Sequence, residues 1–229
     1  MKICLFSDIH GNRYAFTVAL PQIKKICADI NIFLGDICGY YFEPITIWRD
    51  LLSLPNLIAI LGNHDNFFLE CIKNNSVPES YTQKYGPALK FLIQNNSAEQ
   101  KEFLQWIRQL KPHYTDPDGL FSCYHGGPAS ASSEYLYPDS PLPKTKERYI
   151  FTGHTHYPML RTNGETIFCN PGSIGQPRQG GNPTFATLEI DGSHYEWELH
   201  QFSYDKASLL SSLAAHINLP PYLSNILQR

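Results

Sequence analysis

The stretch LIAILGNHDN, residues 57–66, joins an apolar run to a cluster of polar side chains. The apolar part is typical of a buried strand, and Gly62 permits a tight turn directly after it. Two earlier segments have the same form, KICLF at 2–6 before SDIHGN and INIFLGD at 30–36. Helical patterns lie between the three runs, at 13–27 and 45–52, and Pro21 predicts a kink or an early stop in the first. This alternation predicts a parallel α/β sheet with both faces covered.

The second half of the chain predicts a further sheet. Residues 66–112 have helical spacing and would form a cap-like segment over the first sheet. Short strand-like pieces follow, with turns between them, at 119–127, 148–156, 165–173, 184–192 and 194–202. They favour a second, partly antiparallel sheet, and a last helix is expected at 205–217. Because no Gly/Ser linker separates the halves, we expect residues 1–229 to form a single domain.

The composition limits the classes of protein to which the chain can belong. The chain has 229 residues, a net charge of −3 and 42% hydrophobic residues, which is enough apolar material for a core. Without a basic block, the sequence does not support binding to duplex nucleic acid. The widely spaced cysteines lack a CxxC pair and favour reduced thiols. The first apolar run is too short for a signal peptide, and no run of about 18 apolar residues predicts a membrane span. We therefore expect a cytoplasmic protein.

Polar residues of one chemical kind follow the predicted strands. They are Asp8 and His10, then Asp36, then Asn63, His64 and Asp65, then His125, and finally His154 and His156. Open α/β sheets place ligand sites beyond the carboxyl ends of their strands, so these side chains are expected to meet. Carboxylate and imidazole ligands together suit Mn²⁺, Fe or Zn²⁺ better than Ca²⁺, and the lack of clustered cysteines argues against a thiolate zinc site.

Each of these residues also has a structural reading. Asp36 after a glycine is a common helix N-cap, Asn63 and Asp65 are common in turns, and a single histidine such as His125 is often a satisfied core residue. Taken as an ordered set behind buried strands, they favour a metal site over these separate readings.

The set resembles the calcineurin-like metallophosphoesterase family. The matching motifs run in order along almost the whole chain: DIH (8–10), GD (35–36), GNHD (62–65), HGG (125–127) and GHTH (153–156). Further stretches, including GDICGYYFEP (35–44) and NPGSIGQPR (170–178), are similar to a small bacterial-type phosphodiesterase branch related to diadenosine tetraphosphatases. The resemblance implies an α/β (α+β) fold, a four-layer αββα sandwich with two mixed β-sheets flanked by helices.

The resemblance also implies two divalent metal ions, with Mn²⁺ as the first choice and Fe, Zn²⁺, Ni²⁺ or Co²⁺ as alternatives. The first ion would be held by Asp8, His10, Asp36 and His156. The second would be held by Asp36, Asn63, His125 and His154, so that Asp36 bridges the two. Two ions about 4 Å apart lower the pKa of a shared water, and the hydroxide attacks a phosphate ester in line.

Two residues between the ligands would carry catalysis. By the resemblance, His64 serves the leaving group and Asp65 fixes its imidazole. Arg178 and, less strongly, Arg13 are predicted to contact substrate phosphate, because guanidinium matches phosphate oxygens. Tyr40, Tyr41, Tyr135 and Tyr137 either stack on an aromatic substrate group or pack the loops.

The sequence leaves three functions open. The leading one is a metal-dependent phosphodiesterase acting on a small nucleotide-like phosphate ester. A phosphomonoesterase, such as a protein phosphatase, is disfavoured because ICGYY follows Asp36 where that branch has a GDxVDRG motif. A non-catalytic metal-binding scaffold is disfavoured because every predicted ligand and His64 are retained.

Overall fold

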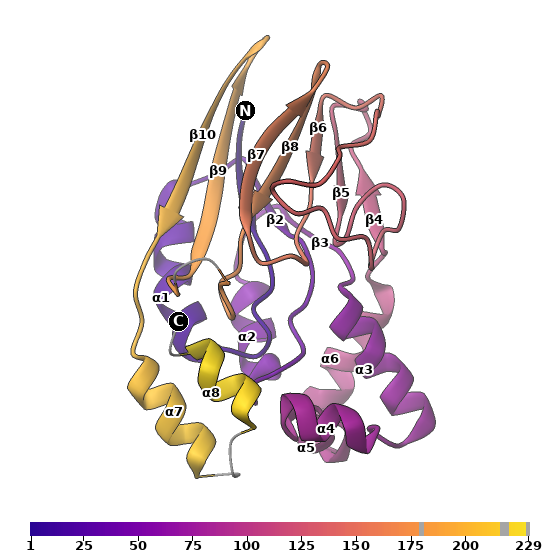
Figure 1. Cartoon of the computed structure of the whole chain (residues 1–229), viewed down its shortest axis with the longest axis vertical. Helices are drawn as coiled ribbons and strands as arrows, with labels where there is room; N and C mark the ends of the chain where they lie inside the picture. The colour runs from indigo at the N-terminus through magenta and orange to yellow at the C-terminus, as the bar shows by residue number, and fades with distance from the viewer. Residues whose placement is uncertain (179–180, 216–219, 228–229) are drawn as a thin grey trace.

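Two five-stranded mixed sheets form the centre of the computed structural model, which describes residues 1–178, 181–215 and 220–227 (Figure 1). The first sheet has the order β10-β9-β1-β2-β3. Its strands are β1 Lys2–Phe6, β2 Ile30–Phe33, β3 Leu57–Ala59, β9 Thr184–Asp191 and β10 His194–Gln201. The second sheet has the order β4-β5-β6-β8-β7. Its strands are β4 His113–Thr115, β5 Phe121–Tyr124, β6 Tyr149–Phe151, β7 Pro158–Asn163 and β8 Thr166–Pro171.

The last two strands lie in a different sheet from the one predicted. β9 and β10 were expected in the second sheet, but β9 pairs antiparallel with β1 and β10 pairs antiparallel with β9. The register places Lys2 opposite Glu189, and their side chains form an ion pair at 3.2 Å. The second sheet is completed instead by β4 and β7, two edge strands that were not predicted. Each sheet thus has three parallel strands, β1, β2 and β3 or β5, β6 and β8.

Helices α1 (Arg13–Ile26) and α2 (Pro44–Leu51) cover the outer face of the first sheet. They bury Phe16 and Ile47 in one cluster with Phe6 and Phe33 of the strands. Asn12 caps α1 through its side-chain oxygen, which accepts from the backbone of the third residue of the helix. The helix continues past Pro21 to Ile26, so the predicted early stop is wrong.

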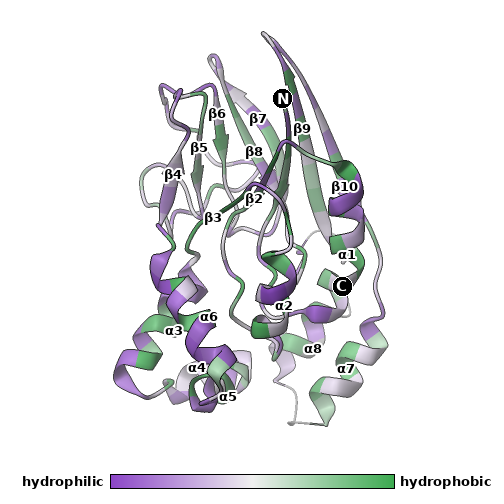
Figure 2. Cartoon of the chain, turned by 180° about the vertical axis from the view of Figure 1, so that it is seen from behind, coloured by the Kyte–Doolittle hydropathy of each residue, from purple (hydrophilic) through white to green (hydrophobic). Residues whose placement is uncertain are grey.

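Alternate strand residues fill the space between the sheets. Ile3, Leu5 and Ile32 point inward from the first sheet and meet Phe121, Tyr149 and Phe151 of the second. On the outer face of the second sheet, Ile150 and Phe168 pack with residues of the loop between β5 and β6, namely Leu136 and Leu142. Figure 2 shows hydrophobic residues along β5, β6 and β9, and mixed colours on the helices. The predicted pair of mixed sheets with flanking helices is confirmed.

The remaining helices gather at one end of the sheets, the end where the parallel strands terminate (Figure 1). They are α3 Asn63–Asn74, α4 Glu79–Tyr85, α5 Ala88–Gln94, α6 Ala98–Gln109, α7 Lys206–Ala214 and α8 Pro221–Leu227. The predicted helical character of 66–112 and of the last helix agrees with this, although residues 216 and 217 of that helix lie outside the described residues. α8 was not predicted. In the described part of the chain, no helix is long and apolar enough to cross a bilayer.

Candidate metal centre

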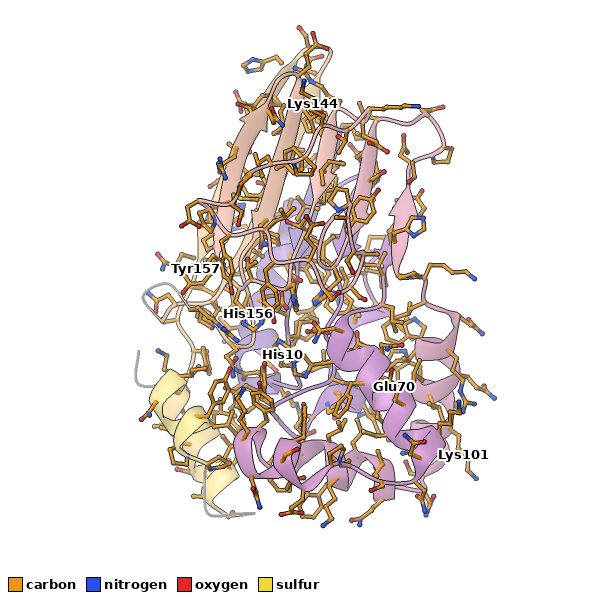
Figure 3. All side chains as sticks on the ribbon, turned by 45° about the vertical axis from the view of Figure 1, so that its right-hand side comes forward. His10, Glu70, Lys101, Lys144, His156 and Tyr157 are labelled. Carbon is orange, nitrogen blue, oxygen red and sulfur yellow. The ribbon has the colours of Figure 1, made fainter. Side chains whose placement is uncertain are left out.

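The predicted ligands converge where the two sheets end. Asp8 and His10 follow β1, Asp36 follows β2, and Asn63 begins α3 directly after β3. From the second sheet, His125 follows β5, and His154 and His156 follow β6. In Figure 3 His10 and His156 lie in the interior between the strands and the helices, while Lys101 and Lys144 lie far apart on the outside.

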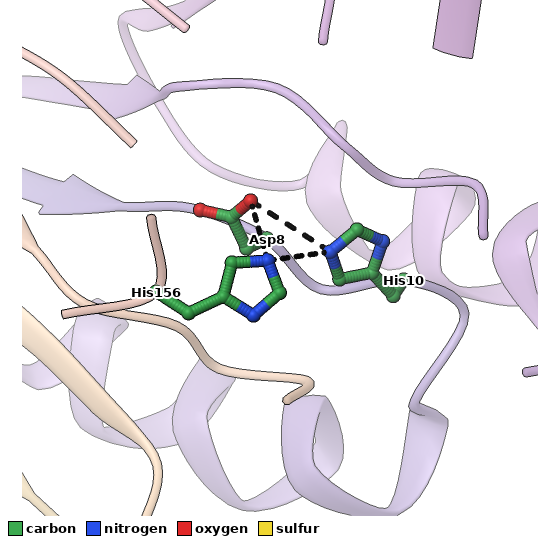
Figure 4. Close-up of side chains that lie close together, drawn as sticks. All are labelled: Asp8, His10 and His156. Carbon is green, nitrogen blue, oxygen red and sulfur yellow. Dashed lines mark hydrogen bonds and ion pairs between the residues drawn. The ribbon is translucent and has the colours of Figure 1, made fainter. Parts of the chain in front are cut away.

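Asp8, His10 and His156 form the first group (Figure 4). His156 Nε2 lies 3.3 Å from Asp8 Oδ1 and 3.1 Å from His10 Nε2, and His10 Nε2 lies 3.7 Å from the same carboxylate oxygen. All three side chains are buried. The three residues come from the ends of β1 and β6, so this group joins the two sheets.

Asp36 lies between this group and a second one. Its Oδ1 accepts a hydrogen bond from the His64 backbone at 2.8 Å, which leaves Oδ2 directed at His125 Nε2 (3.3 Å) and His10 Nε2 (3.8 Å). His125 Nε2 also lies 2.9 Å from Asn63 Oδ1. The His154 ring lies 5.0 Å from the His125 ring between centroids, so His154 adjoins the second group. Asp36 thus occupies the place expected of a bridging carboxylate.

The backbone at these residues is unusual. Asp8, His10, Asp36, His154 and His156 all have positive φ, between 52° and 64°. This left-handed conformation is uncommon outside glycine, and Asp, Asn and His adopt it most readily. Each such residue costs on the order of 1 kcal/mol, and such strain clusters at functional sites. At positions 154 and 156 the left-handed backbone directs the two histidine side chains to different groups, although only one residue separates them.

Gly62 of the GNHD motif is required by close packing. A Cβ atom on Gly62 would collide with the Asp36 carboxylate and with the Asp36 backbone nitrogen. The glycine therefore lets the start of α3 approach the loop after β2, which brings Asn63 beside His125.

The ligand atoms of these groups present lone pairs that are suited to a cation. The Nδ1 atoms of His10 and His156 lie 3.0 Å from Cys38 O and 2.6 Å from Gln176 O, respectively. A carbonyl oxygen can only accept, so each Nδ1 carries a proton and the facing Nε2 atom of the neutral ring presents a lone pair. Two such lone pairs at 3.1 Å beside a carboxylate repel one another unless a cation lies among them. The buried His154 Nε2 has no hydrogen-bond partner among the described residues.

Burial and charge act differently on the histidines. Burial holds the pKa of His10 well below its usual range and lowers the pKa of His154 to about 4, so both rings are neutral and ready to bind a metal. Burial opposes a charge on His125 as well, but the carboxylates of Asp36 and Asp8 outweigh it and raise its pKa to about 10. A proton on His125 thus takes the place of a cation in the metal-free protein, and metal binding would release it.

Comparison with known proteins decides the family. The sequence model of one protein family, the calcineurin-like phosphoesterase superfamily domain, matches residues 1–193. This range includes every residue of both groups. The chain belongs to the calcineurin-like phosphoesterase superfamily.

Relatives of this phosphoesterase match it over most of its length and most of their own. An uncharacterized protein of Methanocaldococcus jannaschii, MJ0912, is 28% identical over 89% of this chain and 88% of its own. Phosphodiesterase YfcE of Escherichia coli K12 is 24% identical over 83% of this chain and 89% of its own. The crystal structure of a metallophosphoesterase from Sphaerobacter thermophilus superposes with a TM-score of 0.79 at 26% identity, covering 100% of this chain and 98% of that one.

The phosphoesterase centre opens into a cavity of about 540 Å³. Besides Asp36, Asn63, His154 and His156, it is lined by His64, Arg178, Lys84 and many aromatic rings. Three of the tyrosines predicted as possible stacking residues, Tyr40, Tyr135 and Tyr137, line this cavity, and so do Tyr81, Tyr85 and Tyr222. The last three were missed, although the four-residue spacing of Tyr81 and Tyr85 on a predicted helix places both on one face.

Two predicted substrate contacts lie elsewhere. Arg13 is exposed and lines a separate surface hollow with Thr17 and Glu43, so it does not reach this cavity. Tyr41 is fully buried in a cluster with Leu209 and Leu213 and cannot stack on a substrate. Arg178, in contrast, lines the cavity, where its Nη2 donates to the Tyr222 hydroxyl at 3.1 Å.

Asp65 does not orient His64, which corrects the sequence-based prediction. The buried Asp65 carboxylate accepts three backbone N–H groups, from Asp36 at 2.8 Å, Cys38 at 2.9 Å and Gly62 at 3.1 Å. The His64 ring nitrogens instead lie 3.1 and 3.2 Å from two tyrosine hydroxyls. Asp65 therefore holds the Asp36 loop against the start of α3 and positions the Asp36 backbone rather than the imidazole.

Replacing Asp65 with Asn is expected to destabilise the metal-free protein by about 2 kcal/mol, because an amide nitrogen would face a buried N–H donor. The measurement is urea unfolding. Asp118→Asn, which removes the same charge from an exposed turn, is the matched control. Weaker metal binding by the Asp65 variant is also expected, since the Asp36 loop loses its anchor. An unchanged unfolding midpoint would show that the three hydrogen bonds do not fix this loop.

Proposed function

We propose that the protein is a metal-dependent phosphodiesterase that hydrolyses a small nucleotide-like phosphate ester at a dinuclear centre. Asp8, His10 and His156 would hold one divalent cation, and Asn63, His125 and His154 the other, with Asp36 shared between them. Mixed carboxylate, amide and imidazole ligands suit Mn²⁺, and the alternatives Fe, Zn²⁺, Ni²⁺ and Co²⁺ accept the same ligand types. When bound, the two cations would supply an activated water nucleophile and neutralise phosphate charge.

The protein's own residues would position the ester. Arg178 is a half-buried guanidinium in the cavity beside His154 and His156, where it can meet a phosphate oxygen. His64 lies on the cavity wall and lends its ring to the leaving oxygen, as a general acid does. Asp36 contacts the His64 backbone, so the proposed bridging ligand and the proposed acid are fixed to one another.

The observation that carries the proposal is the continuity of the Asp/His cluster with a tyrosine-lined cavity. A volume of about 540 Å³ is typical of small-molecule sites. Tyr135 and Tyr137 are stacked at 5.7 Å between centroids and partly exposed at its edge, where they offer flat faces to an aromatic group. The relative YfcE is a phosphodiesterase, which supports a diester as the substrate class.

A panel of aryl phosphate monoesters and diesters, assayed in defined metals with and without chelator, tests the proposal. We expect faster turnover of bis(4-nitrophenyl) phosphate than of 4-nitrophenyl phosphate with Mn²⁺, loss of both with chelator, and recovery on adding the metal back. Faster monoester turnover would instead indicate a phosphomonoesterase. No turnover of any ester with Mn²⁺, Co²⁺ or Ni²⁺ would favour a non-catalytic metal-binding scaffold.

A further inference from the structure

Two phenol hydroxyls hold the His64 imidazole. Its Nδ1 lies 3.1 Å from the Tyr81 hydroxyl and its Nε2 lies 3.2 Å from the Tyr40 hydroxyl. The two tyrosines come from different parts of the chain, Tyr40 from the loop after β2 and Tyr81 from α4. Among the described residues, no side-chain carboxylate forms a hydrogen bond with this ring, since Asp65 is committed to backbone groups and Asp36 Oδ1 accepts only the His64 backbone N–H.

Tyr81 is itself fixed in place. Its ring lies 4.8 Å from Phe67 of α3 and 4.9 Å from Tyr85 of its own helix, measured between centroids. Burial raises the pKa of the Tyr81 hydroxyl, so the phenol stays neutral at ordinary pH and keeps both a proton and lone pairs. The phenol can therefore accept a hydrogen bond from Nδ1–H of His64 without adding a charge to the site.

The two ring nitrogens have different surroundings. The Tyr40 ring packs against His10 at 4.5 Å, which links the Nε2 side of His64 to the metal centre. Tyr81 lies on the opposite nitrogen and ties that nitrogen to the helical segment 66–112. Because Tyr81 occupies Nδ1, the leaving oxygen of a substrate can reach only Nε2. To do so, the leaving oxygen takes the place of the Tyr40 hydroxyl.

We propose that Tyr81 is a positioning residue that holds Nδ1–H of His64, so that Nε2–H is directed at the leaving oxygen. This rests on the proposed role of His64 as the general acid. For the transfer the ring carries a proton on each nitrogen, a form that burial disfavours by lowering the pKa of His64 and that the Tyr81 oxygen favours by accepting Nδ1–H. As the P–O bond breaks, the leaving oxygen takes that bond's electron pair and the Nε2 proton. A neutral imidazole remains, protonated at Nδ1 and still donating to Tyr81.

Tyr81→Phe tests the proposal with two substrates, methyl 4-nitrophenyl phosphate and methyl phenyl phosphate, on the metal-loaded protein. The more basic phenol leaving group needs protonation more than nitrophenolate does. We expect kcat for the phenyl ester to fall about tenfold, the size of one hydrogen bond. For the nitrophenyl ester it should fall less than about twofold, with KM and bound metal unchanged. Phenylalanine keeps the ring that packs against Phe67, so folding is expected to survive, and urea unfolding checks this.

Two comparisons make the result decisive. Tyr195→Phe removes a hydroxyl from β10, outside the lining of the cavity, and it should leave the ratio of the two rates at the native value. In a His64→Ala background, Tyr81→Phe should cause no further loss, because its effect passes through His64. Equal losses for both esters, or a full additional loss in that background, would overturn the proposal. If His64→Ala itself shows no dependence on the leaving group, then the proposed role of His64 fails, not only that of Tyr81.

Discussion

Replacing Asp36 with Asn is expected to lower kcat/KM for an aryl diester by about a thousand-fold, the scale of several kcal/mol of transition-state charge stabilisation. Asp36 Oδ2 faces both His125 and His10, so the change removes the one charge that both proposed cations would share. Metal content after dialysis is expected to fall below two ions per chain. Steady-state kinetics and elemental analysis of the same samples measure the two effects together.

The Asp36 variant also makes a prediction about stability. Burial opposes a charge on Asp36, but His125 and His64 outweigh it and hold the pKa of this carboxyl well below its usual range, so removing the charge should lower the urea midpoint of the metal-free protein. Asp118→Asn serves as the control for the loss of one exposed charge. Full activity of the Asp36 variant with two bound ions would remove this carboxylate from the centre.

Replacing His64 with Ala is expected to lower kcat by about 10²- to 10⁴-fold, the usual contribution of a general acid, while both metal ions stay bound. His64 also lies with His10 and Asp36 in a group of possible ligands, but the two proposed sites are complete without its ring, which contacts two tyrosine hydroxyls. The measurements are kcat and metal content. His113→Ala, which removes an exposed histidine from β4, should match the native protein in both.

Replacing Asn63, the residue before His64, is expected to affect metal binding rather than the catalytic step. Asn63→Ala is expected to weaken metal binding, because Asn63 Oδ1 lies beside His125 Nε2, and its activity should recover at higher metal concentration. Metal loss from the His64 variant, or an unchanged kcat with full metal content, would contradict the separate roles given to these two residues.

The sequence predicts most of the centre because its ligands follow buried strands. Apolar runs ending in Asp8, Asp36 and Asn63 place those residues at one edge of a parallel sheet by geometry alone. The division of His154 and His156 between two groups was implied only by the family resemblance and could not be predicted from their spacing, because it depends on left-handed backbone at both positions. A two-residue spacing in an extended chain would have sent both side chains to the same side.

The incorrect predictions have physical causes of their own. β9 and β10 read as strands, but pairing partners are set by tertiary packing, and nothing in their residues names β1 as the neighbour. Asp65 is adjacent to His64 in sequence, yet as the third residue of α3 it turns back to the helix N-terminus, where it accepts the Gly62 N–H, and it also accepts two N–H groups of the loop after β2. The tyrosines that hold His64 come from positions 40 and 81, and sequence distance hides them.

Anomalous diffraction from crystals grown with Mn²⁺ tests the central claim most directly. We expect two manganese peaks per chain, one among Asp8, His10 and His156 and one among Asn63, His125 and His154, with Asp36 between them. A single peak, or peaks bound to other residues, would contradict a dinuclear centre built from these side chains.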